Sequence, residues 1–157
     1  MNSNKKVRIL MIDDEKDIVE ILSEILEDMD CDVTSFSTEV DIDQIQKEEY
    51  DVVFLDFNNP HTDPIKLFND VLIHKDLYVL IYTGYGTIKN VQKFKQLGIH
   101  GIMHKPVDIQ HISTLIESLK KIANLPKRIR IILNHKLIEK LYFFIKFQIQ
   151  VSLLVFY

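Results

Sequence analysis

Residues 50–64 read YDVVFLDFNNPHTDP, an apolar run that ends in one carboxylate and then breaks into loop and turn residues. Residues 52–55 predict a buried strand, and Asp56 stands at its carboxyl end. In a parallel α/β sheet, ligands bind at the carboxyl ends of the strands, because the loops there open away from the packed layers. Asp56 is therefore a candidate functional residue if other strands bring polar side chains to the same edge.

The chain around this stretch alternates short apolar runs with amphipathic segments. The predicted strands cover residues 7–12, 32–36, 52–55, 77–82 and 101–104. Helical spacing of apolar residues predicts helices through 18–29, 40–48, 64–72, 88–97 and 109–119. Strict alternation of five strands and five helices predicts a parallel sheet with helices on both faces, joined by right-handed crossovers.

Several helix ends carry recognisable signals. Glu15 and Asp17 lie in the predicted first turn of the first helix, where acidic residues are favoured. Asp63 followed by proline predicts the start of the third helix. Gly98 fits the end of the fourth helix, and Asp108 fits the cap of the fifth.

Length and composition agree with one ordinary domain and a small appendage. The chain has 157 residues, of which 46% are hydrophobic. This is enough for a hydrophobic core that needs no disulfide or structural metal. Its single cysteine, Cys31, excludes an internal disulfide, and the first residues lack the apolar region of a signal peptide. We therefore expect a reducing, cytoplasmic location.

Charge divides the chain into two parts. Residues 1–125 carry 13 basic and 22 acidic residues, whereas residues 126–157 carry 6 and 1. An acidic body argues against binding of nucleic acid by that body and suits a metal cation. We expect a domain at residues 1–125 and a basic, apolar tail at residues 126–157.

The tail permits more than one structure. Residues 145–153 alternate apolar and polar side chains like a half-buried strand, whereas residues 137–145 fit one face of a helix. Lys146, Gln148 and Gln150 interrupt an apolar run that is too short to span a membrane. The tail is too small for an independent output domain, which leaves a dimerisation or docking element, a membrane-surface contact, or the start of something longer.

Polar residues stand at the carboxyl ends of four predicted strands: Asp13 and Asp14, then Asp56, Thr83 and Lys105. Each alone has an ordinary explanation as a helix-start acid, a turn residue, a strand-end hydroxyl or a loop cation. Together, three carboxylates at one edge would raise each other's pKa unless a cation lies among them, and such oxygen ligands suit Mg²⁺. A hydroxyl and an ammonium beside them suit phosphate oxygens, so the edge fits a phosphoryl group.

These motifs resemble the receiver domain of two-component response regulators. The matching stretches are residues 9–15, residues 52–56 together with Pro60, residues 81–86 and residues 101–106. The resemblance covers roughly residues 5–123. It implies a doubly wound, five-stranded parallel sheet in the flavodoxin-like order 2-1-3-4-5, with helices on both faces.

The resemblance also implies a phosphoaspartate switch. Asp56 would take a phosphoryl group from a sensor histidine kinase or a histidine phosphotransfer protein, and Thr83 and Lys105 would bind the phosphoryl oxygens. The implied magnesium ligands are Asp13, Asp14, Asp56 and the backbone carbonyl of Asn58. The phosphorylated form would change its contacts with a downstream protein target or with a second copy in a homodimer. Such a protein is no metabolic enzyme, because it catalyses only its own phosphoryl transfer and dephosphorylation.

The chain departs from the family pattern at its output position. The family usually has an aromatic switch residue three positions before the lysine, and Ile102 stands there. Pro64 replaces a usual glycine, and Asn58 and Tyr85 lie where the family tunes self-dephosphorylation. These departures motivate an alternative, a receiver-like scaffold that binds partners without phosphorylation.

Overall fold

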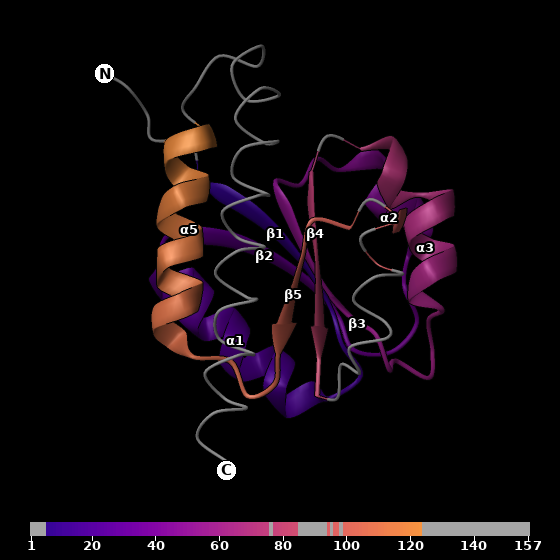
Figure 1. Cartoon of the computed structure of the whole chain (residues 1–157), viewed down its shortest axis with the longest axis horizontal. Coiled ribbons are helices and arrows are strands. Elements are labelled where there is room, and N and C mark those ends of the chain that lie inside the picture. Colours follow the sequence, from indigo (N-terminus) through magenta and orange to yellow (C-terminus); the bar gives the residue numbers. More distant parts are fainter. Residues whose placement is uncertain (1–5, 76, 85–93, 95, 98, 124–157) are drawn as a thin grey trace.

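The computed structural model describes residues 6–75, 77–84, 94, 96–97 and 99–123. Five parallel strands form one sheet in the order β2-β1-β3-β4-β5 (Figure 1). The strands are β1 (Val7–Ile12), β2 (Cys31–Phe36), β3 (Val52–Asp56), β4 (Tyr78–Thr83) and β5 (Gly101–His104). The predicted fold class and strand order are confirmed.

Helices cover both faces of this sheet. They are α1 (Lys16–Asp28), α2 (Ile42–Lys47), α3 (Pro64–Asp70), a 3₁₀ turn η1 (Leu72–His74) and α5 (Ile109–Ala123). Figure 1 shows α1 and α5 on one side of the sheet and α2 and α3 on the other. The described part of the chain contains no helix with the length and apolar character needed to cross a membrane.

Two hydrophobic clusters fix the helices to the sheet. On the α1 and α5 side, the strands pack against buried helix residues, which include Val19, Leu26, Ile112, Leu115 and Ile116. On the other side, the buried helix residues include Ile45, Leu67 and Phe68. Successive side chains of a strand point to opposite faces, so each inner strand supplies residues to both clusters.

Side chains cap the helices where the sequence predicts. Asp63 Oδ1 accepts hydrogen bonds from the backbone of Ile65 and Lys66, and Pro64 occupies the first turn of α3. Asp108 Oδ1 accepts from the backbone of Gln110 at the start of α5. These two helix starts are confirmed.

Several predicted boundaries need correction, among them the start of β2, which is Cys31, and both ends of the helix predicted at 40–48, which covers Ile42–Lys47. The helix after Pro64 ends at Asp70 instead of continuing through Leu72, because Val71 leaves helical geometry at φ −127° and a 3₁₀ turn follows. Strand β4 begins one residue later than predicted and includes Thr83. Glu15 is the N-cap of α1 and does not lie in its first turn.

Two predicted features fall where little or nothing is described. Most of the helix predicted through residues 88–97, with its closing Gly98, lies outside the described residues, as does Tyr85. The tail predicted at residues 126–157 lies wholly outside them.

Helix α5 offers a matched test of the packing. We expect Ile116→Ala to lower the free energy of unfolding by about 2–5 kcal/mol, because Ile116 is 1% exposed and its removal leaves a cavity. Ile109→Ala, in the same helix but 53% exposed, should cost less than about 1 kcal/mol. Equilibrium unfolding in urea measures both. Equal losses would show that the buried face of α5 is assigned wrongly.

Candidate functional site

The sheet register brings the predicted strand-end residues to one edge. Ile12 pairs with Leu55, which places Asp13 beside Asp56 at the ends of β1 and β3. The backbone N–H of Lys105 donates to the carbonyl of Thr83 at 2.9 Å, which holds the end of β5 against the end of β4. Parallel strands in this register therefore assemble residues that lie far apart in the sequence.

Three carboxylates converge at this edge. Asp13 is 0% exposed and Asp56 is 3% exposed, while Asp14 is half-buried. One oxygen of each lies within 4.8 Å of the others. Burial raises the pKa of Asp56, and the charges of Asp13 and Asp14 add to that rise, whereas a backbone hydrogen bond from Asn58 and the charge of Lys105 oppose it. The expected crowding of carboxylates is confirmed for Asp56, although burial contributes more than the neighbouring charges.

Lys105 is the cation that lies among these acids. Its Nζ is 2.6 Å from Asp13 Oδ2, 2.6 Å from Glu15 Oε1 and 3.6 Å from Asp56 Oδ2. It also lies over the ring of Tyr82, 4.9 Å from the centroid. Burial lowers the pKa of Lys105, but its contacts with Asp13 and Glu15 outweigh burial and raise the pKa above its usual range. The ammonium therefore stays charged at neutral pH.

The acids fit a divalent cation. Asp13 Oδ2 is buried, and its contact within the described residues is the 2.6 Å ion pair with Lys105. Among the described residues, four acids, namely Asp13, Asp14, Glu15 and Asp56, lie around one ammonium, so this part of the edge carries excess negative charge. Carboxylate oxygens with this charge are the donor set that Mg²⁺ prefers.

Thr83 approaches the site from the other face of the sheet. Residues alternate along β4, so Thr83 lies on the side of Ile81, which packs with α2 and α3. Asn58 connects it to the acids: its backbone N–H donates to Asp56 Oδ1 at 3.2 Å, and its side-chain amide donates to Thr83 Oγ1 at 3.5 Å. The structure thus brings Thr83 near Asp56 through Asn58.

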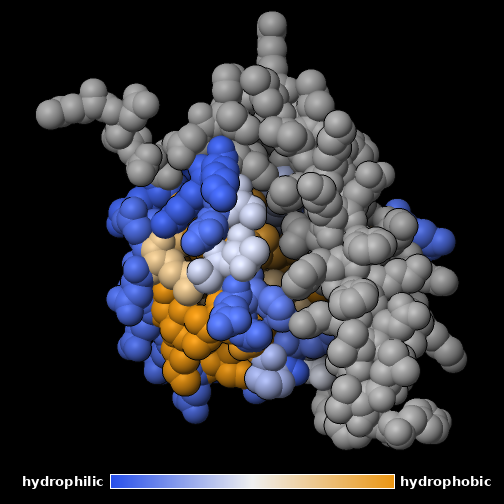
Figure 2. All heavy atoms as spheres, turned by 60° about the vertical axis from the view of Figure 1, so that its left-hand side comes forward, coloured by the Kyte–Doolittle hydropathy of each residue, from blue (hydrophilic) through white to orange (hydrophobic). Residues whose placement is uncertain are grey.

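An open groove leads from solvent to Asp56. Its residues come from α1, the strand ends and the segment after β5, and they include Asp14, Ile18, Ile21, Asn58 and Lys105. One wall is charged, whereas the wall from α1 is apolar. Figure 2, which turns this side of the molecule forward, shows a hydrophobic area of surface next to hydrophilic side chains.

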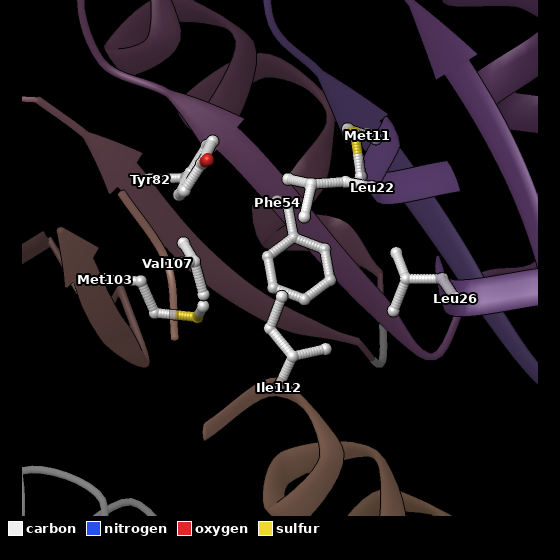
Figure 3. A pocket seen from close by; sticks show the side chains of 8 residues that line it. All are labelled: Met11, Leu22, Leu26, Phe54, Tyr82, Met103, Val107 and Ile112. Atoms are coloured by element: carbon white, nitrogen blue, oxygen red, sulfur yellow. The ribbon is translucent and has the colours of Figure 1, made fainter. Parts of the chain in front are cut away.

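A small apolar pocket lies below the groove. Figure 3 shows Phe54 pointing from the sheet toward Ile112 of α5, with Leu26 of α1 beside it. Tyr82 lines both this pocket and the groove, and burial raises the pKa of its hydroxyl to about 12. The floor of the site is therefore the core between the sheet, α1 and α5.

Residues 9–117 match the family model of the response regulator receiver domain. The chain belongs to this family. Among curated relatives, this receiver domain is 29% identical to sporulation initiation phosphotransferase F of Bacillus subtilis over 112 residues, which cover 70% of this chain and 90% of that protein. It is 28% identical to the two-component response regulator ORR26 of Oryza sativa, where the match covers 69% of this chain and only 19% of the relative.

Solved structures show the same fold. A CheY-like receiver domain protein from Methanospirillum hungatei superposes with a TM-score of 0.65 at 21% identity, covering 74% of this chain and 98% of that one. The chemotaxis protein CheY4 of Vibrio cholerae gives a TM-score of 0.65 at 20% identity, covering 73% and 99%. The fold of the receiver domain is thus shared across the described sheet.

Two residues of the site escape the sequence argument. Glu15 reads as an ordinary helix-start acid, and Tyr82 reads as one more apolar strand residue. Both were missed because their importance comes from contact with Lys105, which is 90 residues away from Glu15 in the chain. The only sequence signal for Glu15 was its position directly after the Asp13–Asp14 pair.

The buried charge of Asp56 gives a pH-dependent prediction. We expect Asp56→Asn to raise the free energy of unfolding by about 1 kcal/mol at pH 7, because it removes a desolvated carboxylate from beside two others. The folded-state pKa is raised, so the gain is full above that pKa and fades as pH falls toward about 3.9, where the carboxyl is protonated in both states. Urea unfolding at several pH values measures this.

Glu24→Gln provides the control, since Glu24 is an exposed acid on α1. It should change stability by less than about 0.5 kcal/mol at any of these pH values. A loss of stability in Asp56→Asn at pH 7 would contradict the assigned environment of Asp56.

Proposed function

We propose that the chain is a phosphoacceptor of two-component signalling, in which Asp56 takes a phosphoryl group in a Mg²⁺-dependent reaction. The observation that carries the proposal is the position of Asp56. It is the last residue of a buried strand and borders an open groove, and its Oδ2 lies 3.6 Å from the Lys105 ammonium, which also contacts Asp13. Its carboxylate thus combines a nucleophilic oxygen with nearby groups that offset charge.

The donor we propose is a phosphohistidine on a sensor histidine kinase or a histidine phosphotransfer protein. An Asp56 oxygen forms a bond to phosphorus while the phosphorus–nitrogen bond breaks, and the bonding electron pair stays on the leaving imidazole. The carboxylate attacks without a proton to lose, so no general base is needed. The chain's contribution is positioning and electrostatic stabilisation, as in other phosphoryl transfers.

The excess negative charge of the site explains the metal requirement. A phosphoryl group is anionic, and within the described residues the Lys105 ammonium is the one cation beside the carboxylates of Asp13, Asp14, Asp56 and Glu15. Mg²⁺, held by Asp13, Asp14, Asp56 and the carbonyl of Asn58, would offset the charge on the phosphoryl oxygens. Lys105 and Thr83 would bind the remaining oxygens, as an ammonium and a hydroxyl can.

The phosphorylated form is proposed to change its contacts with a downstream protein target or a second copy, and the chain is proposed to have no metabolic activity of its own. Residues 126–157 would supply a docking or dimerisation element. Ile102 is 3% exposed in the core on the α2 and α3 side, and it lacks a ring that could turn in and out. Thr83 lies on the same side of the sheet, which makes the end of β4 the proposed origin of the response.

Intact mass spectrometry after incubation with acetyl phosphate tests this function. We expect one phosphoryl adduct on the wild type with Mg²⁺, and none when the metal is chelated. Asp56→Ala should remove the adduct, because it deletes the strand-end carboxylate that borders the groove beside Lys105.

Asp70→Asn is the matched control, because Asp70 is an exposed acid at the end of α3. It should be phosphorylated like the wild type. An adduct that survives in Asp56→Ala would overturn Asp56 as the acceptor, whereas a wild type without any adduct would favour the scaffold that works without phosphorylation.

A further inference from the structure

Glu15 occupies the N-cap position of α1, but its side chain bonds to a residue outside the helix. The side chain forms no capping hydrogen bond. Its Oε1 instead accepts a hydrogen bond of 2.6 Å from Lys105 Nζ. The backbone N–H of Glu15 donates to Asp13 Oδ1 at 2.9 Å, which fixes this residue beside the acids. The carboxylate is therefore committed to Lys105 and not to its own helix.

Lys105 lies closer to Glu15 than to the proposed phosphoacceptor. The Nζ–oxygen distance is 2.6 Å to Glu15 and 3.6 Å to Asp56. Asp13 Oδ2, also at 2.6 Å, and the ring of Tyr82, with its centroid at 4.9 Å, lie around the same ammonium. An ammonium has three protons to donate, and the hydrogen bond to Glu15 uses one of them. A phosphoryl oxygen on Asp56 would therefore compete with Glu15 and Asp13 for Lys105.

Of the two close partners, Glu15 is the one that can leave. Asp13 is 0% exposed and has no route to solvent, whereas the Glu15 side chain is 55% exposed. Rotation of Glu15 into water restores its hydration at little cost, because most of that hydration is already present. Removal of Asp13 from the ammonium would leave a buried charge without a partner.

We propose that Glu15 is a positioning residue that holds Lys105 in the resting state and is exchanged for a phosphoryl oxygen when Asp56 is phosphorylated. This inference rests on the proposed function of Asp56. No covalent bond changes at Glu15; one hydrogen-bond acceptor of the ammonium replaces another. Glu15 consequently opposes occupation of the site, and its removal favours the phosphorylated arrangement.

A double-mutant cycle with beryllofluoride, an anionic mimic of the phosphoryl group, tests this exchange. Its affinity is measured in the presence of Mg²⁺ by ¹⁹F NMR for the wild type, Glu15→Gln, Lys105→Met and the double variant. We expect Glu15→Gln to bind about two- to fivefold more tightly, the range for loss of a competing ion pair. In the Lys105→Met background the same change should give no more than about a quarter of that gain.

Asp17→Asn controls for simple repulsion between acids and the anion, since Asp17 is another exposed acid near the start of α1. Its effect should be below about 1.5-fold, as expected for an exposed charge that is partly screened. Unfolding curves of the same samples show that each variant is folded.

The outcomes separate the two proposals. If the wild type binds beryllofluoride and Glu15→Gln binds no more tightly, the exchange is overturned while the proposed function of Asp56 stands. An equal gain in the Lys105→Met background, or in Asp17→Asn, also overturns the exchange, because the effect would then not pass through Lys105. If the wild type does not bind the mimic at all, both the function and the exchange fail.

Discussion

The imbalance of charge at the carboxyl ends of the strands is the constraint on which this site depends. In the described part of the chain, Asp13, Asp14, Asp56 and Glu15 lie around the Lys105 ammonium, and two of these acids are almost fully buried. Buried like charges are costly unless a cation compensates them. Lys105 offsets part of that cost, and the proposed divalent cation would offset the rest. In the proposed function, the added cation also offsets the charge of an incoming phosphoryl group.

The arrangement of the sheet explains how one edge serves both chemistry and response. Asp56 lies on the same face as Phe54, toward α1 and α5, whereas Thr83 lies on the face of Ile81, toward α2 and α3. Asn58 connects the two faces through hydrogen bonds to Asp56 and Thr83. A change at Asp56, the proposed phosphoacceptor, can therefore reach the opposite layer without passing through an aromatic residue at position 102.

Much of this structure can be predicted from the sequence, because its signals are local. Apolar runs that end in acids, and capping residues such as Asp63, give the strands and the helix starts, whereas the strand order follows from the resemblance to receiver domains. The end of α3 could not be predicted from Val71 and Leu72. Both are apolar and buried, and a buried 3₁₀ turn uses the same residue types as a buried helix. Glu15 could not be assigned because its role depends on Lys105, a contact across the fold that no local pattern records.

Stabilisation by Mg²⁺ tests the central role of this charge imbalance most directly. Equilibrium unfolding of the wild type with and without Mg²⁺ should show a gain that grows with the metal concentration as RT ln(1 + [Mg²⁺]/Kd). In Asp13→Asn, the gain should fall strongly, because the substitution removes a buried carboxylate charge that is proposed to hold the metal. A wild type that Mg²⁺ does not stabilise, or an Asp13→Asn variant that it stabilises equally, would contradict the account.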